Sequence, residues 1–284
     1  MYKALQIKAR TVAKRTGDPT PTQEYLVRHL LESFLDRLSR SEHGQDFVLK
    51  GGILLSAYGA RRPTRDADAN AISADVTPEH LRQVVTHLAA IPTHDGVVFN
   101  VESIRIQNIR DAADYPGFRV RVKASIGPWQ GTSVWDVSIG DPIVPNPRWI
   151  TIERVIGDPI KMLGYSAETI IAEKTVTILE RGVTSTRWRD YLDIVQLCRQ
   201  GFDASELRRS AEAIAQYRGV VLEPVGPHLA GYGDIAQLKW AAWRRKEHLE
   251  QKCETQLDEQ VALVAQFIDP VFAETEPTHL ATEP

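Results

Sequence analysis

The chain has 284 residues, enough for one large domain or two modest ones with a buried core. Apolar residues make up 43% and charged residues 25%, and the longest apolar runs are shorter than a transmembrane helix, so the composition predicts a globular protein with no membrane partner. The net charge of −3 excludes bulk attraction to nucleic acid, so RNA binding would need local basic patches. Cys198 and Cys253 are too few for a disulfide framework or a structural zinc site. The N-terminus lacks the apolar stretch of a secretory signal, which predicts a cytoplasmic protein.

The N-terminal part of the chain mixes helical and strand patterns. Apolar residues recur at every fourth position from Leu26 to Leu38, after Pro21, and this spacing predicts a helix with one buried stripe. Residues 47–49 predict a short buried strand, which ends at a pair of glycines and leads into a short helix over residues 53–58. Thr77-Pro78-Glu79 combines a capping hydroxyl with proline at the first helical position, so it predicts a helix that runs to about residue 90.

Further segments alternate polar and apolar residues, which is the period of a strand with one buried face. They cover residues 66–72, 97–109, 118–126 and 133–139, and residues 114–117 predict a turn between two of them. After Pro147 the pattern is helical, with predicted helix starts at Ser166, at residues 184–186, and at Ser205, Asp234 and Gln256. The sequence therefore predicts an α+β fold. An N-terminal domain with a mixed, mostly antiparallel sheet covers residues 1–150, and an all-helical domain covers residues 151–284.

Asp66 and Asp68 lie two residues apart in the first of these alternating segments, so both carboxylates project from one face of a strand. Two such oxygen ligands suit Mg²⁺ or Mn²⁺, because these ions take few protein ligands and complete their shell with water and substrate phosphates. Taken alone, an Asp-x-Asp pair is more typical of a polar edge strand with solvated acids.

Two further features give the acid pair its context. Lys50, Gly51 and Gly52 stand where a strand leads into a helix, and bare backbone N–H groups at a helix N-terminus form an anion site. Asp136 lies in the middle of another strand, opposite its apolar neighbours, so it shares the open sheet face with the acid pair. Three acids on one open face beside a glycine-rich turn are typical of two-metal phosphoryl transfer. The predicted metal ligands are therefore Asp66, Asp68 and Asp136.

A basic stripe lies on another of the predicted strands. Arg119, Arg121 and Lys123 alternate with apolar residues, so all three side chains should look out on the same open face as the acids. We expect the stripe to draw in phosphates of a nucleotide or of RNA, because arginine grips phosphate oxygens in pairs. The alternatives are a solvated strand face or pairing with Glu102 or Asp136 across the sheet.

The order of these motifs resembles a known group of enzymes. Gly51-Gly52, then Asp66-Ala67-Asp68 and then Asp136 resemble the DNA polymerase β-type nucleotidyltransferase superfamily. The closer resemblance is to the AbiEii/AbiGii (MenT) toxin family, whose Thr-x-Asp-x-Asp segment is matched by Thr64 to Asp68. A later helix with lysine is matched at Lys174, and an Arg-x-Arg/Lys-Asp-x-x-Asp helix is matched by residues 187–193. The resemblance covers roughly residues 49–197, about half of the chain.

The resemblance implies a metal-dependent toxin of a toxin–antitoxin system. Such an enzyme transfers a nucleoside monophosphate from an NTP to RNA, here the tRNA 3′ end, and so blocks translation, with an antitoxin protein as partner. The expected catalytic residues are Asp66, Asp68, Asp136, Lys174 and Asp190. The expected nucleotide-binding residues are Lys50, Gly51, Gly52, Lys174, Arg119, Arg121 and Asp193. From the residues alone, Lys174 is equally typical of a solvated lysine, and Asp190 and Asp193 of exposed acids near a helix N-terminus, with Asp193 free to pair with an arginine.

One departure from the superfamily concerns phosphate binding. Members often carry Gly-Ser where this chain has Gly51-Gly52, and the serine hydroxyl would contact the triphosphate. Gly52 offers only its N–H, so we expect more of the phosphate binding to come from Lys174 and neighbouring bases. Two other functions stay open at this point. One is nucleotidylation of a protein or small-molecule hydroxyl, and the other is a non-catalytic nucleotide-binding module, against which the three intact acids argue.

Overall fold

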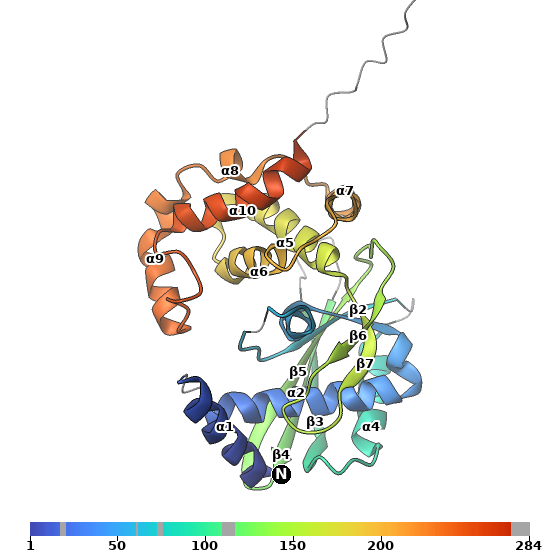
Figure 1. The fold of residues 1–284 in the computed structure, drawn as a ribbon. Coiled ribbons are helices and arrows are strands. Elements are labelled where there is room, and N and C mark those ends of the chain that lie inside the picture. The colour runs from blue at the N-terminus through green and yellow to red at the C-terminus, as the bar shows by residue number, and fades with distance from the viewer. Residues whose placement is uncertain (18–20, 61, 73–75, 110–116, 274–284) are drawn as a thin grey trace, which may run out of the picture. The chain divides into compact units, whose positions relative to one another are not determined.

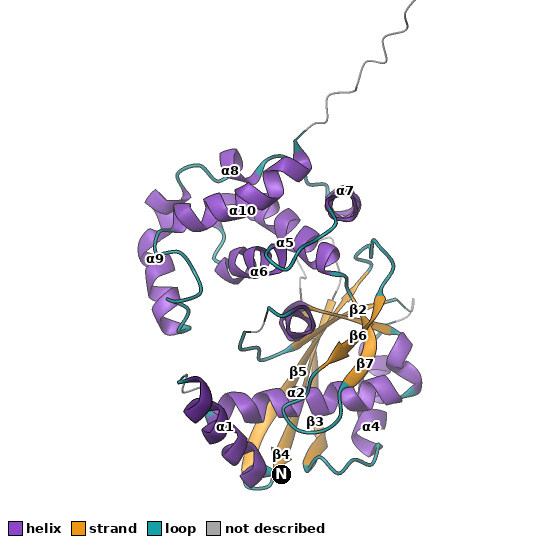
Figure 2. Cartoon of the chain, in the orientation of Figure 1, coloured by secondary structure: helices purple, strands orange, loops and turns teal. Residues whose placement is uncertain are grey.

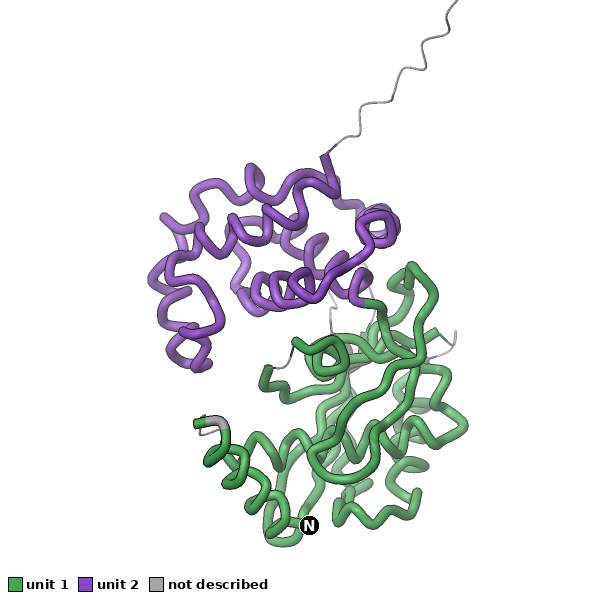
Figure 3. Tube along the Cα trace, in the orientation of Figure 1, with its two compact units in different colours: residues 1–166 green, residues 167–284 purple. Residues whose placement is uncertain are grey.

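The computed structural model describes residues 1–17, 21–60, 62–72, 76–109 and 117–273. The chain folds as two compact units, one from Met1 to Ser166 and one from Ala167 onward (Figure 3). The first unit is built on a mixed sheet, and the described part of the second is helical (Figure 2). The α+β fold predicted from the sequence is confirmed.

A seven-stranded sheet forms the framework of the first unit, in the order β3-β4-β5-β2-β1-β7-β6 (Figure 1). Its strands are β1 (Phe47–Lys50), β2 (Ala67–Ala71), β3 (Val97–Ile109), β4 (Gly117–Ile126), β5 (Trp129–Ile139), β6 (Arg148–Ile152) and β7 (Ile160–Gly164). β2 pairs in parallel with β5 and β1 with β7, and the other neighbours are antiparallel. The short strands β1 and β2 thus occupy the middle of the sheet.

Helices cover the apolar face of this sheet. The helices of the first unit are α1 (Tyr2–Thr16), α2 (Thr22–Arg40), α3 (Gly51–Leu54) and α4 (Pro78–Ala90), with 3₁₀ turns η1 (Glu42–Gln45) and η2 (Leu55–Tyr58). The predicted stripe of α2 is buried, and its Phe34 ring lies 5.3 Å from that of Trp135 on β5. Phe47 on β1 packs 4.6 Å from the same tryptophan, so one buried aromatic cluster joins α2 to two central strands.

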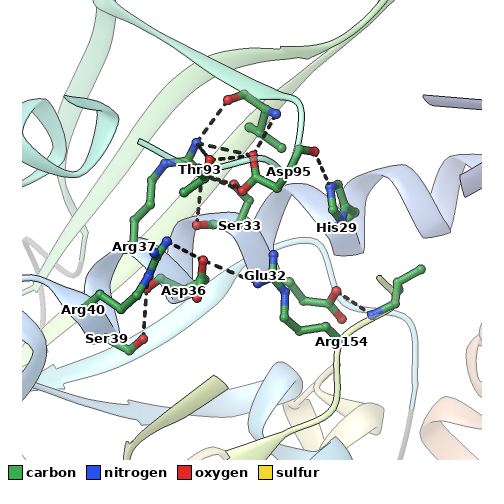
Figure 4. Close-up of polar contacts among 12 residues, drawn as sticks. His29, Glu32, Ser33, Asp36, Arg37, Ser39, Arg40, Thr93, Asp95 and Arg154 are labelled. Atoms are coloured by element: carbon green, nitrogen blue, oxygen red, sulfur yellow. Dashed lines mark hydrogen bonds and ion pairs between the residues drawn. The ribbon is translucent and has the colours of Figure 1, made fainter. Parts of the chain in front are cut away.

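A buried polar network holds α2 to the segment before β3 (Figure 4). The guanidinium of Arg37 donates to Asp95 at 3.0 Å and to the Thr93 hydroxyl at 2.6 Å. Ser33, one turn earlier, donates to the same carboxylate at 2.7 Å. Although burial alone raises the pKa of Asp95, the hydrogen bonds from Ser33 and the Val97 amide and the charge of Arg37 lower it below its ordinary value. The ion pair therefore stays charged inside the unit.

The second unit is helical in its described part. Its helices are α5 (Ala167–Arg181), α6 (Trp188–Cys198), α7 (Ala204–Arg218), α8 (Val225–His228), α9 (Tyr232–Lys246) and α10 (Leu257–Phe272), with a 3₁₀ turn η3 (Gly182–Thr184). Indole rings of α6 and α9 pack together, with the Trp188 and Trp240 centroids 6.5 Å apart. The Trp188 indole donates to the Tyr232 hydroxyl at 2.8 Å, so this aromatic core has its polar edge satisfied.

The structure departs from the sequence expectations after Pro147. β6 and β7 extend the sheet beyond residue 150, whereas the sequence pattern indicated helices there, and the first compact unit ends at Ser166. Each of these strands has five residues, too few for alternation to stand out from the helical signals that follow. α7 is capped by Asp203, which accepts from the Glu206 amide at 2.8 Å, rather than by Ser205. The predicted turn over residues 114–117 lies outside the described residues apart from Gly117, which begins β4.

Both cysteines are free thiols. Burial raises the pKa of Cys198 to about 12 and that of Cys253 to about 11, so both thiols stay protonated near neutral pH. Within the described ranges, none of the helices combines the length and the apolarity that a bilayer crossing requires.

The Arg37–Asp95 pair makes the first prediction. Arg37→Met should lower the free energy of unfolding by about 3–5 kcal/mol, because it leaves the Asp95 charge buried without its guanidinium partner. Arg40→Met on the same helix is the matched control, since the Arg40–Asp36 pair is half-exposed and should contribute under ~1 kcal/mol. Urea unfolding of the two variants checks this, and equal losses would contradict it.

Candidate active site

Charged side chains form a row across the middle of the sheet. Lys50 on β1 lies opposite Asp68 on β2, Asp68 lies beside Asp136 on β5, and Asp136 lies opposite Arg119 on β4. Residues in register on neighbouring strands point to the same sheet face. All four charges therefore lie on one face. The alternation along each strand is predicted from the sequence, and the structure adds the register between the strands.

Three carboxylates converge on this face. Oxygens of Asp66, Asp68 and Asp136 all lie within 4.8 Å of one another, and the three side chains are partly exposed. Ala67 and Ala69, which alternate with Asp66 just before β2 and with Asp68 within it, are buried. The sequence prediction that Asp66, Asp68 and Asp136 gather at one place thus agrees with the structure, and three carboxylates are a donor set that fits hard divalent cations such as Mg²⁺ or Mn²⁺.

Arg119 neutralises part of this charge. Its Nε donates to Asp136 Oδ1 at 2.7 Å and its Nη2 donates to Oδ2 at 2.5 Å, a two-pronged contact across the β4–β5 ladder. The hydrogen bonds that Arg119 donates to Asp136, together with the negative charges of Asp136, Asp66 and Asp68, raise the pKa of Arg119 above its ordinary value. The structure therefore places this predicted nucleotide-binding arginine against a carboxylate, which is the cross-sheet pairing that the sequence left open.

The rest of the basic stripe extends along the same face of β4. Arg121 donates from Nη1 to Gln107 on β3 at 2.5 Å, and Lys123 is exposed. Arg105 on β3 lies in register with Arg121, so two neighbouring strands each contribute a guanidinium here. Like charges placed side by side repel, so this part of the sheet is not arranged for stability alone.

Lys50 lies in a buried contact at the other end of the row. Its Nζ is 3.0 Å from Asp141 Oδ2, and the two side chains are 8% and 3% exposed. The backbone carbonyl of Asp141 and the hydroxyl of Tyr165 contact the amide of Asn70, at 2.8 and 3.0 Å. The predicted nucleotide-binding Lys50 is thus part of a buried polar layer beside the carboxylates.

Neighbouring side chains leave no room for a Cβ atom at either glycine of the Gly51-Gly52 pair. Gly51 has a φ of +69°, and a Cβ there would lie 2.0 Å from Asp68 Oδ2. Glycine is required because the backbone turns through the left-handed region directly beneath the carboxylate. A Cβ at Gly52 would lie 2.2 Å from the hydroxyl oxygen of Thr64 and 3.1 Å from a guanidinium nitrogen of Arg62. The space that a serine side chain would need at position 52 is therefore filled by the Thr64 hydroxyl.

Thr64, Arg62 and Asp141 were not assigned roles from the sequence. Thr64 was recognised only as part of the Thr-x-Asp-x-Asp segment, and its proximity to Gly52 depends on how the turn before β2 folds back. Asp141 follows β5 by two residues, and its pairing with Lys50 bridges two strands that are not adjacent in the sheet. The sequence does contain one indication of Thr64. Because position 52 lacks the serine hydroxyl that superfamily members often carry, another hydroxyl close to the site could take its place.

Lys174, Asp190 and Asp193 form one cluster within the second unit. The Lys174 ammonium lies 2.6 Å from Asp190 Oδ1 and 2.8 Å from Asp193 Oδ2, and Asp193 is fully buried. Arg187 donates to the second oxygen of Asp190 at 2.7 Å. Spacing of three residues on α6 puts both acids on the face that meets Lys174 of α5. These three side chains are therefore not solvated surface charges. Asp193 pairs with Lys174.

Comparisons with known proteins cover most of the chain. The family described as "Nucleotidyl transferase AbiEii toxin, Type IV TA system" matches residues 33–272. A putative nucleotidyltransferase from Helicobacter pylori has a similar solved structure, with a TM-score of 0.52 and 16% identity over 89% of this chain and 96% of its own. JHP933 from Helicobacter pylori is similar with a TM-score of 0.51 and 16% identity over 88% of this chain and 92% of its own. At this identity the likeness shows a shared fold. No curated protein matches the sequence.

The buried Lys174 cluster makes a pH-dependent prediction. Burial alone raises the pKa of Asp190, but the charges of Lys174 and Arg187 outweigh it and hold the pKa below its ordinary value of 3.8. A carboxyl with a lowered folded pKa contributes stability above its unfolded pKa and loses it as the pH falls through the folded value. Asp190→Asn should therefore cost about 3 kcal/mol of unfolding free energy at pH 7, and the difference from wild type should shrink below pH ~4.

Asp234→Asn is the control for this measurement, because Asp234 is an exposed acid in the first turn of α9. Denaturant unfolding at several pH values between 3 and 7 gives the two profiles. A difference for Asp190→Asn that grows toward acid pH would show that the assigned sign is wrong.

Proposed function

The chain belongs to the AbiEii family of nucleotidyltransferase toxins of type IV toxin–antitoxin systems, and on that basis we propose that it transfers a nucleoside monophosphate from an NTP to RNA. The proposed acceptor is the 3′ end of tRNA, whose modification would block translation. A cognate antitoxin protein is the proposed regulatory partner. The observation that carries the proposal is the convergence of Asp66, Asp68 and Asp136 above the glycine pair.

The three carboxylates would hold Mg²⁺ or Mn²⁺ with the triphosphate. Such an ion neutralises the charge that develops on the phosphoryl oxygens during transfer. Gly51 leaves room for Asp68 to lie directly over the backbone, so the carboxylate is fixed where it meets the other two acids. In this proposal Asp66 and Asp68 serve as ligands, and Asp136 has a further role.

Asp136 would accept the proton of the attacking hydroxyl. Each of its oxygens receives one hydrogen bond from Arg119 and keeps a second lone pair for another partner. As the acceptor oxygen bonds to the α-phosphorus, the bond from that phosphorus to the bridging oxygen breaks and pyrophosphate leaves with the electron pair. Arg119 holds Asp136 in one orientation during this step, so we assign it a positioning role rather than a direct grip on the nucleotide.

Thr64 would supply the phosphate-binding hydroxyl. Its Oγ1 fills the place beside Gly52 where a serine side chain would stand, and the Arg62 guanidinium lies against the same place. A hydroxyl donor and a guanidinium suit the oxygens of a triphosphate or of departing pyrophosphate. In this proposal Thr64 makes the phosphate contact that a serine at position 52 would otherwise make.

RNA as acceptor is supported by the basic stripe. Arg121 and Lys123 of this stripe, with Arg105 beside them on β3, extend from the carboxylates along a path suited to the phosphates of a nucleic-acid end. Lys174 is proposed to neutralise triphosphate charge, with Asp190 and Asp193 as its ion partners, on the strength of the family motif that these residues match.

The proposal predicts metal-dependent labelling of RNA. The purified chain, incubated with Mg²⁺ and each α-³²P-labelled NTP, should label total tRNA and not total protein. Asp68→Asn should lower the rate about 1,000-fold, because the lost ligand contributed several kcal/mol of charge stabilisation. Glu102→Gln, an exposed acid on β3, is the matched control and should leave the rate unchanged.

Each alternative has its own outcome in this assay. If the label enters protein or a small molecule and tRNA stays unlabelled, the acceptor is a hydroxyl of that protein or small molecule and not RNA. Nucleotide binding without transfer to any pool would indicate a non-catalytic module. A full rate for Asp68→Asn would remove the carboxylates from the mechanism.

Positions 52 and 64 make a second prediction. Thr64→Ala should weaken the apparent affinity for NTP about tenfold, because a hydrogen bond to a charged group is lost. Gly52→Ser should lower both stability and affinity, since its Cβ would meet the Thr64 hydroxyl at 2.2 Å. The double variant Gly52→Ser/Thr64→Ala should recover both, because removing that hydroxyl leaves 3.1 Å to the next atom, the end of the flexible Arg62 side chain.

Melting temperature and NTP affinity, measured on all four proteins, form a double-mutant cycle. Thr64→Ser, which keeps the hydroxyl, should retain wild-type affinity. Additive losses in the double variant would show that the two positions do not share one space, and an unaffected Thr64→Ala would remove the hydroxyl from phosphate binding.

A further inference from the structure

A second cluster of metal-ligating side chains lies at the other end of β1. η1 and Asp46 precede this strand, whereas the glycine pair follows it. Glu42 and His43 come from η1, and His87 comes from the last turn of α4. Each of these three side chains offers a ligand atom, and the atoms all lie within 4.8 Å of one another. The proposed nucleotide transfer uses none of them.

The two separations measured from Glu42 are close to those in a metal coordination shell. Glu42 Oε1 lies 3.8 Å from His43 Nε2 and 3.4 Å from His87 Nδ1. Ligands at ~2.0–2.1 Å from a tetrahedral ion are separated by about 3.3–3.4 Å. These two separations thus lie within about half an ångström of the spacing in a tetrahedral shell.

Asp46 prepares His43 for this role. Its Oδ2 lies 3.2 Å from His43 Nδ1, so the carboxylate can accept a hydrogen bond from that nitrogen while Nε2 faces Glu42. A carboxylate behind a metal-binding histidine fixes the tautomer and the ring orientation in the same way in many metal sites.

The surrounding structure orients the rings. The Ser41 hydroxyl accepts from the His43 amide and caps η1, which holds this residue at the start of β1. The His80 ring, on the same face of α4 as His87, packs edge-on to that of His43 with centroids 5.6 Å apart. The rings of His43 and His87 lie 5.9 Å apart at 83°. Both imidazoles are thus held in position by the helical segments that carry them, η1 and α4.

We propose that Glu42, His43 and His87 bind one borderline divalent cation of the Zn²⁺ class. Two imidazoles and one carboxylate suit Zn²⁺, whereas the three carboxylates of the candidate active site suit Mg²⁺ or Mn²⁺. Three protein ligands leave a fourth position for water or an outside ligand. The side chains of Glu42 and His87 are 73% and 46% exposed, so the ion reaches them without unfolding. The bound ion would tie η1 to the end of α4.

The test is Zn²⁺ binding to the metal-stripped full chain, measured by calorimetry and by thermal unfolding. Wild type should bind one Zn²⁺ at this site and melt at a higher temperature with it, because an ion that binds only the folded state stabilises it. His87→Ala should weaken that binding at least tenfold and abolish the rise in melting temperature. Asp46→Asn should weaken binding by about 10-fold while all three ligands remain. Co²⁺ should give a visible absorption band in wild type that His87→Ala lacks.

Two controls separate this site from other sources of binding. His228→Ala removes a histidine that also contacts a carboxylate, Glu223 at 2.6 Å, but in the second unit, and it should bind Zn²⁺ as wild type does. Asp68→Asn disables the carboxylates of the candidate active site and should likewise keep the Zn²⁺ affinity. Loss of binding in Asp68→Asn, or unchanged binding in both His87→Ala and His43→Ala, would overturn the proposal. These readouts do not depend on nucleotide transfer, so they stand apart from the test of that function.

Discussion

Mutual repulsion of three carboxylates governs the arrangement of the central sheet. Asp66, Asp68 and Asp136 share one face at close range, and without compensation such a cluster would oppose folding. Arg119 compensates from one side through the β4–β5 register. On the other side Lys50 lies opposite Asp68 and also contacts the buried Asp141, so its charge is shared. The strand order β4-β5-β2-β1 thus brackets the acids between two cations.

The two flanking cations stabilise the three acids and still leave room for the metal ion of the proposed function. The contact with Arg119 uses one lone pair on each Asp136 oxygen, so each oxygen keeps another lone pair for a second partner. The opposite sheet face is closed by apolar packing of Phe34 and Phe47 on Trp135, which gives the acids a rigid support. Rigid support matters because a ligand set loose by an ångström loses much of its effect on a transition state.

Strand alternation made much of the site predictable. Because side chains alternate strictly along a strand, the sequence alone placed Asp66, Asp68, Asp136 and the basic stripe on one face. Which residue on one strand meets which on the next is set by register, and that depends on turns whose geometry the sequence does not display. Arg119 could be placed on the correct face but not assigned to Asp136, and Lys50 could not be paired with Asp141, which lies 91 positions later. The same limit hid His43 and His87, which scatter along the sequence and meet only through the packing of η1 and α4.

The crowding at Gly52 has a consequence for how such a sequence can change over time. One volume above the backbone holds either the Thr64 hydroxyl or a side chain at position 52, but not both. A lineage that acquires serine at position 52 must therefore lose the hydroxyl at position 64 or shift the intervening turn, and each single step passes through a worse protein. Among descendants the two positions should change together, and alanine at position 64 with glycine at position 52 would be the milder intermediate, because it loses a hydroxyl without creating a clash.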